Sequence, residues 1–228
     1  MRDSVGIFGG AFDPIHKGHT KSLLEIKNLI NFSELKIIPC GLPSQKDKTE
    51  ASNHERLSML EMTFRGYQNI KIDPIEIEKK SISYTVDTLE TFKKSYKPDQ
   101  HFTLIMGLDA FLNFTTWKNY ERILELSSLL VMQRPNYKTD RAYLEQFKDS
   151  ITEDINVFLN NHGKIIFYSL SQFDISSTKI KQAIKNELNY EDYLEQKVVD
   201  FLEENSIYKW RIKVLRLSLI HISEPTRR

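Results

Sequence analysis

The stretch VGIFGGAFDPIHKGH, residues 5–19, joins three features in the order that a nucleotide-binding site needs. An apolar run over residues 5–8 predicts a buried strand, and Gly9-Gly10 predicts a turn where backbone without Cβ can approach a ligand closely. His16 and His19 then flank Gly18 just before an amphipathic segment, so we expect both imidazoles at a helix N-terminus. Free N–H groups and the helix dipole favour phosphate there. The stretch therefore predicts a strand, a turn and a helix arranged around an anionic ligand.

Strand-like and helix-like segments alternate along the rest of the chain. We expect strands over residues 4–8, 35–39, 70–77, 101–106, 129–133 and 164–169, and helices over residues 20–30, 53–66, 85–95, 117–126, 178–186 and 195–205. Polar residues 41–52 and 135–161 are expected to form a loop and an insertion. This alternation indicates an α/β fold, a Rossmann-like, doubly wound parallel sheet in three layers. Ligands bind outside the carboxyl ends of the strands in such sheets, so residues that follow strands are candidates for the site.

The composition sets limits on the class of protein. The 228 residues are 40% hydrophobic and 11% aromatic, which is enough to fill a core. A single cysteine, Cys40, excludes a disulfide framework within the chain, and its place at a strand end predicts a buried, unreactive thiol. No apolar run approaches the roughly 20 residues of a membrane span, and no apolar leader precedes the first strand. We therefore expect a cytoplasmic protein with no membrane partner.

Charge is distributed unevenly along the chain. Residues 209–228 hold six Lys or Arg and one Glu, a net charge of +5, which leaves −4 for residues 1–208. A mildly acidic body is not typical of a nucleic-acid-binding protein. We expect residues 1–208 to form a single domain and the basic tail, residues 209–228, to be non-native or disordered. A genuine basic extension is the alternative.

The pattern G-G-x-F-D-P-x-H-x-G-H, from Gly9 to His19, resembles the motif of the bacterial nicotinate mononucleotide adenylyltransferases, within the H-x-G-H nucleotidyltransferase superfamily. It is not the G-x-G-x-x-G fingerprint of dehydrogenases. The resemblance implies that His16 and His19 are catalytic, donating hydrogen bonds to ATP phosphates as charge develops. It also implies ATP contacts from Gly9, Gly10, Ala11, Phe12 and Lys46. Zinc is the alternative ligand for paired histidines, but it needs a third protein ligand that the sequence does not indicate. We therefore expect no metal site made by the protein alone.

A second block, ISSTKIK at residues 175–181, resembles the I-S-x-T-x-I-R block that contacts ATP phosphates in the same family. Ser176, Ser177 and Thr178 would bind ATP from the start of a helix, and Lys181 would be catalytic. A plain helix N-cap is the alternative interpretation. Lys181 stands where the family has arginine, so the charge is kept but the bidentate fork is lost. A second departure is Gln45, which stands where the family often has histidine.

Two further blocks resemble the acceptor-nucleotide site. In SYTVDTL, residues 83–89, Tyr84 and Thr85 would bind the acceptor, with Thr85 donating to the pyridine carboxylate. The alternative is a helix that Thr85 caps and on which Thr88 is exposed. In GLDAFLNFTTW, residues 107–117, the resemblance assigns the following roles: Gly107 and Asp109 bind ATP, Asp109 also meets an acceptor ribose, and Trp117 stacks on the ring. Phe111 and Phe114 are expected in the core. Arg134 is a further acceptor contact or a solvated charge.

The resemblance implies an enzyme that transfers AMP from ATP to nicotinate mononucleotide, giving nicotinate adenine dinucleotide and pyrophosphate, a step in NAD biosynthesis. Mg²⁺ would be bound through the ATP phosphates. The alternatives are an adenylyltransferase with a nicotinamide mononucleotide or phosphopantetheine acceptor and a non-catalytic nucleotide-binding protein. The sequence leaves homo-oligomerisation open.

Overall fold

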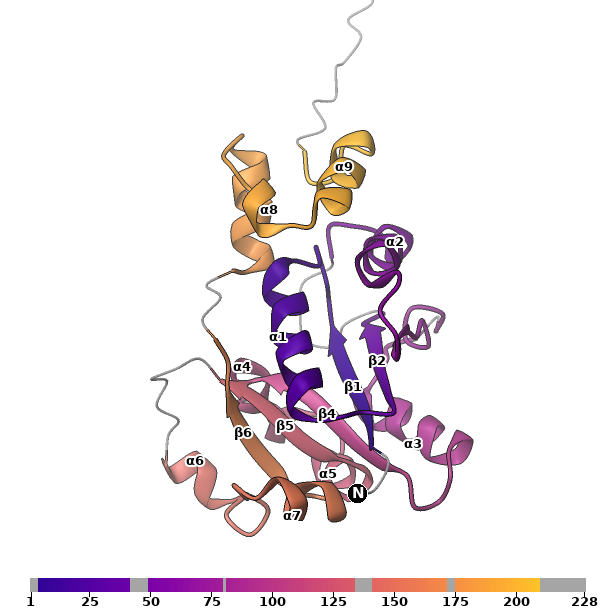
Figure 1. The fold of residues 1–228 in the computed structure, drawn as a ribbon, viewed down its shortest axis with the longest axis vertical. Helices are drawn as coiled ribbons and strands as arrows, with labels where there is room; N and C mark the ends of the chain where they lie inside the picture. The colour runs from indigo at the N-terminus through magenta and orange to yellow at the C-terminus, as the bar shows by residue number, and fades with distance from the viewer. Residues whose placement is uncertain (1–3, 42–48, 80, 134–140, 172–174, 210–228) are drawn as a thin grey trace, which may run out of the picture.

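The computed structural model describes residues 4–41, 49–79, 81–133, 141–171 and 175–209. Six strands form one sheet in the order β3-β2-β1-β4-β5-β6, and every neighbouring pair is parallel (Figure 1). The strands are β1 (Ser4–Gly10), β2 (Glu34–Pro39), β3 (Ile70–Ile72), β4 (His101–Gly107), β5 (Ser128–Gln133) and β6 (Ile165–Ser169). The strand order reverses direction at β1 and β4, which places the switch point beside the end of β1. The expected Rossmann-like fold is confirmed.

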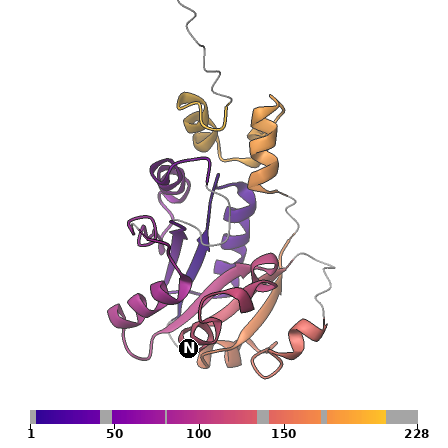
Figure 2. The ribbon, with the colours of Figure 1, turned by 180° about the vertical axis from the view of Figure 1, so that it is seen from behind.

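Helices cover both faces of the sheet, which gives the three expected layers. They are α1 (Lys17–Leu29), α2 (Asn53–Phe64), α3 (Thr85–Ser95), α4 (Leu108–Phe111), α5 (Tyr120–Leu126), α6 (Arg141–Glu145), α7 (Ile155–Asn160), α8 (Ser177–Lys185) and α9 (Gln196–Glu204). One core cluster joins the sheet to α1, α2, α7, α8 and α9. The other joins it to α3, α4 and α5, on the face that Figure 2 brings forward.

Alternation along the central strands explains why there are two cores. Leu130 belongs to the first cluster, whereas its neighbours Leu129 and Val131 belong to the second. Successive side chains of a strand point to opposite faces, so a strand covered on both sides is apolar at every position. The continuous apolar run in β5 therefore fills both layers at once.

Two predicted elements have different bounds in the structure. The strand predicted over residues 70–77 ends at Ile72, because Pro74 cannot donate to a strand ladder and the chain turns there. The helix predicted over residues 117–126 begins at Tyr120, because Asn119 adopts a left-handed φ of 50°. A 3-10 turn over Phe114–Thr116 precedes it.

The polar region 135–161, expected to be an insertion, contributes apolar side chains to both core clusters. Phe147 packs in the second cluster, while Phe158 and Leu159 of α7 pack in the first. Three apolar side chains spaced irregularly among charges give no period by which a sequence reading could place them. Cys40, expected to be buried, is half-buried at the end of β2.

The carboxyl end of β1 points toward α8 and α9, which lie beside α2 at one end of the molecule (Figure 1). Segments far apart in the sequence therefore meet where the motif of residues 9–19 begins. Across the described ranges, the structure contains no helix with both the length and the apolar character that crossing a bilayer requires.

Leu130→Ala should lower the free energy of unfolding by about 2–5 kcal/mol, because it removes a fully buried side chain from the middle of the sheet. Urea denaturation of the purified variant measures this loss. Leu188→Ala, at a side chain that is 61% exposed, is the matched control and should change stability by less than about 0.5 kcal/mol. Equal losses in the two variants would contradict the assignment of Leu130 to the core.

Candidate active site

The loop after β1 has a sharply constrained backbone. Phe12 adopts a left-handed φ of 48°, and the Asp13-Pro14 peptide bond is cis. A Cβ on Gly10, the last residue of β1, would lie 3.0 Å from the buried Phe12 ring, so a side chain there requires the ring to shift. Within the described residues, no hydrogen bond engages the backbone N–H groups of Phe12 and Asp13. The loop therefore offers free donors at the carboxyl end of the sheet. The turn predicted at Gly9-Gly10 is wrong, because both glycines belong to β1 and pair with β2, and the chain turns only after them.

His16 and His19 close the N-terminus of α1 by a reciprocal interaction. The backbone N–H of His19 donates to Nδ1 of His16, and the backbone N–H of His16 donates to Nδ1 of His19, both at 3.3 Å. This is a capping box in which two imidazoles take the places usually held by a hydroxyl and a carboxylate. The two rings stack with centroids 3.7 Å apart and planes 21° apart. The hydrogen bonds thus hold both rings at the start of the helix, and the stacking holds the two rings against each other.

These contacts set the tautomer and the charge of both rings. Since each Nδ1 accepts a hydrogen bond, the network assigns the proton of the neutral ring to Nε2. Burial lowers the pKa of His16 to about 4. Burial also lowers the pKa of His19, which packs edge-on against Phe8 and Phe12, and the neighbouring His16 lowers it further. Both histidines are therefore neutral at pH 7, each with an Nε2–H group left to donate.

Gly18 is required between the two histidines for steric reasons. A Cβ at this position would lie 2.9 Å from Nδ1 of His16 and 3.4 Å from Cβ of Ile175. Any side chain would push the His16 ring away from the stacked arrangement or separate α1 from the segment before α8.

The start of α8 packs directly on the loop after β1. Ser176 is the N-cap, and its hydroxyl oxygen accepts a hydrogen bond from the backbone N–H of Lys179 at 3.2 Å. The hydroxyl of Ser177 donates to the carbonyl oxygen of Pro14 at 3.0 Å. Thr178 is exposed in the first turn. The helix-cap interpretation of this block is confirmed, and the cap lies against the His16 loop, so two helix N-termini meet at one place.

Lys181, one turn further along α8, contacts two carboxylates. Its Nζ lies 2.9 Å from Oδ2 of Asp13 and 3.2 Å from Oε1 of Glu50. Burial alone would lower the pKa of Lys181, but the hydrogen bonds and charges of these carboxylates raise it above the usual value. Lys181 is therefore a fixed ammonium group at the edge of the motif loop.

Arg56 of α2 is a site residue that sequence reasoning missed. Its side chain is fully buried and donates 2.7 Å hydrogen bonds to the carbonyl oxygens of Ala11 and Cys40, at the ends of β1 and β2. A further bond of 2.8 Å goes to Oδ1 of Asn53, and no hydrogen-bond partner of its Nε lies among the described residues. A charged residue on a helix usually faces solvent, so nothing in the pattern marked this one.

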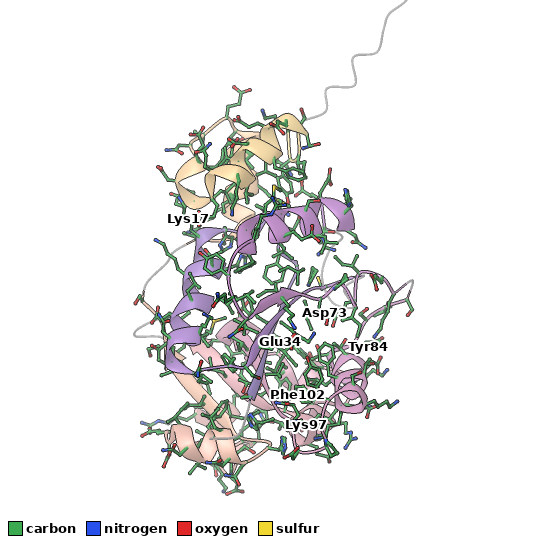
Figure 3. All side chains as sticks on the ribbon, turned by 45° about the vertical axis from the view of Figure 1, so that its right-hand side comes forward. Lys17, Glu34, Asp73, Tyr84, Lys97 and Phe102 are labelled. Atoms are coloured by element: carbon green, nitrogen blue, oxygen red, sulfur yellow. The ribbon has the colours of Figure 1, made fainter. Side chains whose placement is uncertain are left out.

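The residues predicted for the acceptor lie at the start of α3 and around Trp117. Tyr84 is the N-cap of α3 and makes no side-chain cap hydrogen bond, so the alternative in which Thr85 caps this helix is wrong. The same alternative predicted an exposed Thr88, but its side chain is buried and its hydroxyl donates to a carboxylate oxygen of Glu76. Lys118 places its ammonium group 4.3 Å from the centre of the Tyr84 ring, which brings the Trp117 loop to the start of α3. Figure 3 shows Tyr84 on the side of the view away from Lys17, which marks the start of α1.

The other residues of this block divide between core and surface. Phe111 and Phe114 are fully buried, as expected, and Trp117 is half-buried against Phe114 with ring centroids 5.7 Å apart. Asp109 is exposed at the end of β4, beside Gly107, where a Cβ would clash with its carboxylate. Lys46, Gln45, Arg134 and residues 210–228 lie outside the described residues.

Metal-binding chemistry has little support from the protein side chains that the structure describes. Among them, no three His, Cys, Asp or Glu side chains gather closely enough to hold an ion. Both carboxylate oxygens of Asp13, inside the motif, already accept hydrogen bonds from the protein.

Comparisons with known proteins agree with this geometry. The cytidylyltransferase-like family model matches residues 7–183. A probable nicotinate-nucleotide adenylyltransferase of Legionella pneumophila (strain Lens) is 36% identical over 213 residues, which span 90% of this chain and 99% of that protein. The chain belongs to this family. A probable nicotinate-nucleotide adenylyltransferase of Escherichia coli O45:K1 is 33% identical, covering 92% of this chain and all of that protein.

Solved structures of this type share the fold. The Plasmodium falciparum nicotinic acid mononucleotide adenylyltransferase in complex with NaAD superposes with a TM-score of 0.70 at 22% identity, covering 91% of this chain and 98% of that one. A putative nicotinate-nucleotide adenylyltransferase of Vibrio parahaemolyticus gives a TM-score of 0.58 at 16% identity, covering 90% and 95%. At these identities the likeness shows the fold alone.

The histidine pair makes stability depend on pH. A histidine whose pKa is lowered in the folded state is protonated first in the unfolded chain, so its contribution is present above pH 6.5 and is lost toward pH 4. Between those values the loss should reach at most about 1.4 kcal/mol per pH unit for each such histidine. His16→Asn should therefore flatten the dependence of unfolding free energy on pH, measured by urea denaturation between pH 4.5 and 7. An unchanged slope would contradict the buried, neutral state of His16.

Gly18→Ala should cost activity more than stability, because the added Cβ displaces the His16 ring. We expect turnover to fall by at least about tenfold, consistent with misplacement of a positioned hydrogen-bond donor. Gly66→Ala is not a fair control, since Gly66 has a φ of +90°. Asn28→Ala, at an exposed position near the end of the same helix, is a better one and should keep the turnover of the parent. Parental turnover in Gly18→Ala as well would contradict the steric argument.

Proposed function

We propose that this protein transfers the adenylyl group of ATP to the 5′-phosphate of nicotinate mononucleotide, releasing pyrophosphate. The family supplies the reaction class. The observation that carries the proposal for this chain is the neutral, stacked pair His16 and His19 at the start of α1, packed against the start of α8. Two helix N-termini, two Nε2–H groups and the Lys181 ammonium group together suit a polyphosphate chain. Mg²⁺, a homo-oligomer and a cytoplasmic location stay predictions.

The chemistry needs no protein nucleophile. An oxygen of the acceptor phosphate attacks the α-phosphorus of ATP, and the bond from that phosphorus to the oxygen bridging to the β-phosphate breaks. Charge develops on the oxygens of the α-phosphate and on the leaving pyrophosphate. The Nε2–H groups of His16 and His19 would donate to these oxygens, and the neutral rings need no proton transfer to do so. Lys181 and the first turn of α8, with Ser177 and Thr178, would hold the outer phosphates.

Mg²⁺ fits this arrangement only as an ion held by the substrate. Asp13 has no free acceptor position, and no other carboxylate gathers with it into a ligand set among the described residues. Mg²⁺ bound to the triphosphate would neutralise charge on the pyrophosphate. The chain would then bind the ion through ATP oxygens and water.

The acceptor would lie between the start of α3 and the Trp117 loop. The backbone N–H and hydroxyl groups of Thr85 have no partner among the described residues, so they are free to donate to a carboxylate. Trp117 would stack on the pyridine ring, and Asp109 would accept from a ribose hydroxyl. These donors favour the acid nucleotide over the amide.

Pyrophosphate release by the purified protein with ATP and Mg²⁺ tests the reaction and the acceptor together. It should be measured in parallel with nicotinate mononucleotide, nicotinamide mononucleotide and phosphopantetheine. We expect release only, or much faster, with the acid nucleotide. Faster release with another acceptor would support adenylyl transfer but contradict the proposed acceptor. No release with any acceptor would favour a nucleotide-binding protein without turnover.

His19→Ala should lower turnover by about a hundredfold or more, because it removes one donor to the developing charge and the acceptor for the His16 backbone N–H. Thermal denaturation should show a folded protein. His54→Ala, at an exposed histidine on α2, is the control and should retain full activity. Retained turnover in His19→Ala would remove this residue from the mechanism.

A further inference from the structure

The carboxylate of Asp13, inside the motif loop, is saturated with hydrogen bonds. Its Oδ2 accepts from the backbone N–H of Glu50 at 3.0 Å and from Nζ of Lys181 at 2.9 Å. Its Oδ1 accepts from the backbone N–H of Ala51 at 3.0 Å and from the hydroxyl of Tyr208 at 2.7 Å. Four donors from three parts of the chain thus fix one buried side chain, which lies three residues before His16.

Tyr208 reaches this carboxylate from the far end of the described chain. After α9, left-handed backbone at Ser206 (φ 52°) and Tyr208 (φ 63°) turns the chain back. The backbone N–H of Ile207 donates to the carbonyl oxygen of Leu202 at 3.0 Å, and the side chains of Ile207 and Tyr208 are buried in the first core cluster. The turn therefore delivers the Tyr208 hydroxyl to Asp13 at a defined position.

The Tyr208 ring also lies next to the ammonium group of Lys181. The Lys181 ammonium group lies 5.9 Å from the centre of the ring and shares the Asp13 carboxylate with the Tyr208 hydroxyl. Burial, together with the nearby Asp13 charge, raises the pKa of Tyr208 above its usual value, so the phenol keeps its proton and acts as a donor. Tyr208 and Lys181 thus hold opposite oxygens of one carboxylate.

We propose that Tyr208 is a positioning residue for ATP, acting through Asp13 on Lys181 and on the loop before His16. Without the Tyr208 hydroxyl, Oδ1 of Asp13 loses one of its two donors. The carboxylate is then held only by the Glu50 and Ala51 N–H groups and by Lys181 itself, so its position no longer fixes Lys181 as tightly. Lys181 then shifts toward Glu50, whose carboxylate is already 3.2 Å away and also accepts from Lys185 at 2.6 Å. The inference rests on the proposed function in assigning Lys181 to the triphosphate.

Tyr208→Phe isolates this contact, because it removes one oxygen and keeps the buried ring. We expect the KM for ATP to rise about five- to tenfold. The lost hydrogen bond is to a charged group, but it acts on ATP only through Asp13 and Lys181, so only part of its free energy should appear in this KM. The KM for nicotinate mononucleotide should stay within about twofold, since the acceptor residues lie on α3 and the Trp117 loop. A fall in thermal stability alone would not produce this split between the two substrates.

Tyr190→Phe is the matched control. Tyr190 is buried in the same core cluster, and its hydroxyl donates to a carboxylate, that of Glu203 in α9, at 3.3 Å, instead of to Asp13. We expect it to leave both KM values unchanged. If Tyr208→Phe leaves the KM for ATP unchanged, or if both variants raise the KM for both substrates alike, Tyr208 is a structural residue and the inference is wrong.

Binding measurements separate failure of this inference from failure of the proposed function. Titration calorimetry with ATP and Mg²⁺ measures the affinity of the parent and Tyr208→Phe proteins for ATP, and this measurement does not depend on turnover. A protein that binds ATP but releases no pyrophosphate would contradict the proposed function, and a weaker ATP affinity in Tyr208→Phe would still support the inference. Equal ATP affinity in the two proteins would overturn it.

Discussion

The reciprocal hydrogen bonds between His16 and His19 are the constraint on which the rest of the site depends. A helix N-terminus leaves backbone N–H groups without partners, and here two of the backbone donors at this terminus bond imidazole nitrogens. This use of Nδ1 leaves Nε2 as the donor on each ring. The same contacts hold the rings stacked and buried, which keeps them neutral. Capping, tautomer and charge state therefore have one structural origin.

The surrounding architecture serves to keep that pair in place. The loop of residues 10–15 is held from one side by Arg56, which bonds the Ala11 carbonyl, and from the other by α8, whose Ser177 bonds the Pro14 carbonyl. The His16 ring itself leaves no room for a side chain on Gly18, and Ile175 lies against the same position. Because these contacts come from α2 and α8, the site forms only when two helices far apart in the sequence both pack on the sheet.

The sequence was sufficient to predict the parallel sheet, most helices and the place of both histidines at a helix start, because apolar periodicity and the motif order carry that information. It could not reveal Arg56 or Tyr208. A buried arginine on a helix and a tyrosine after the last helix have ordinary local sequences, and their roles come from partners about 45 and 195 positions away. The alternative in which Thr85 caps α3 rested on the frequency of Thr at helix caps, whereas here Tyr84 occupies that position without a side-chain bond.

The balance of charge at this end of the sheet explains why a polyphosphate suits it. Lys181 and Lys185 meet the carboxylates of Asp13 and Glu50, so those four charges compensate one another. Arg56 forms no ion pair with any carboxylate in the described ranges and bonds only neutral oxygens, which leaves one buried positive charge below the loop. In a medium of low dielectric constant that charge acts over a longer range than it would in water. With the helix dipoles of α1 and α8, it makes the loop favourable for an anion before any phosphate contacts a side chain.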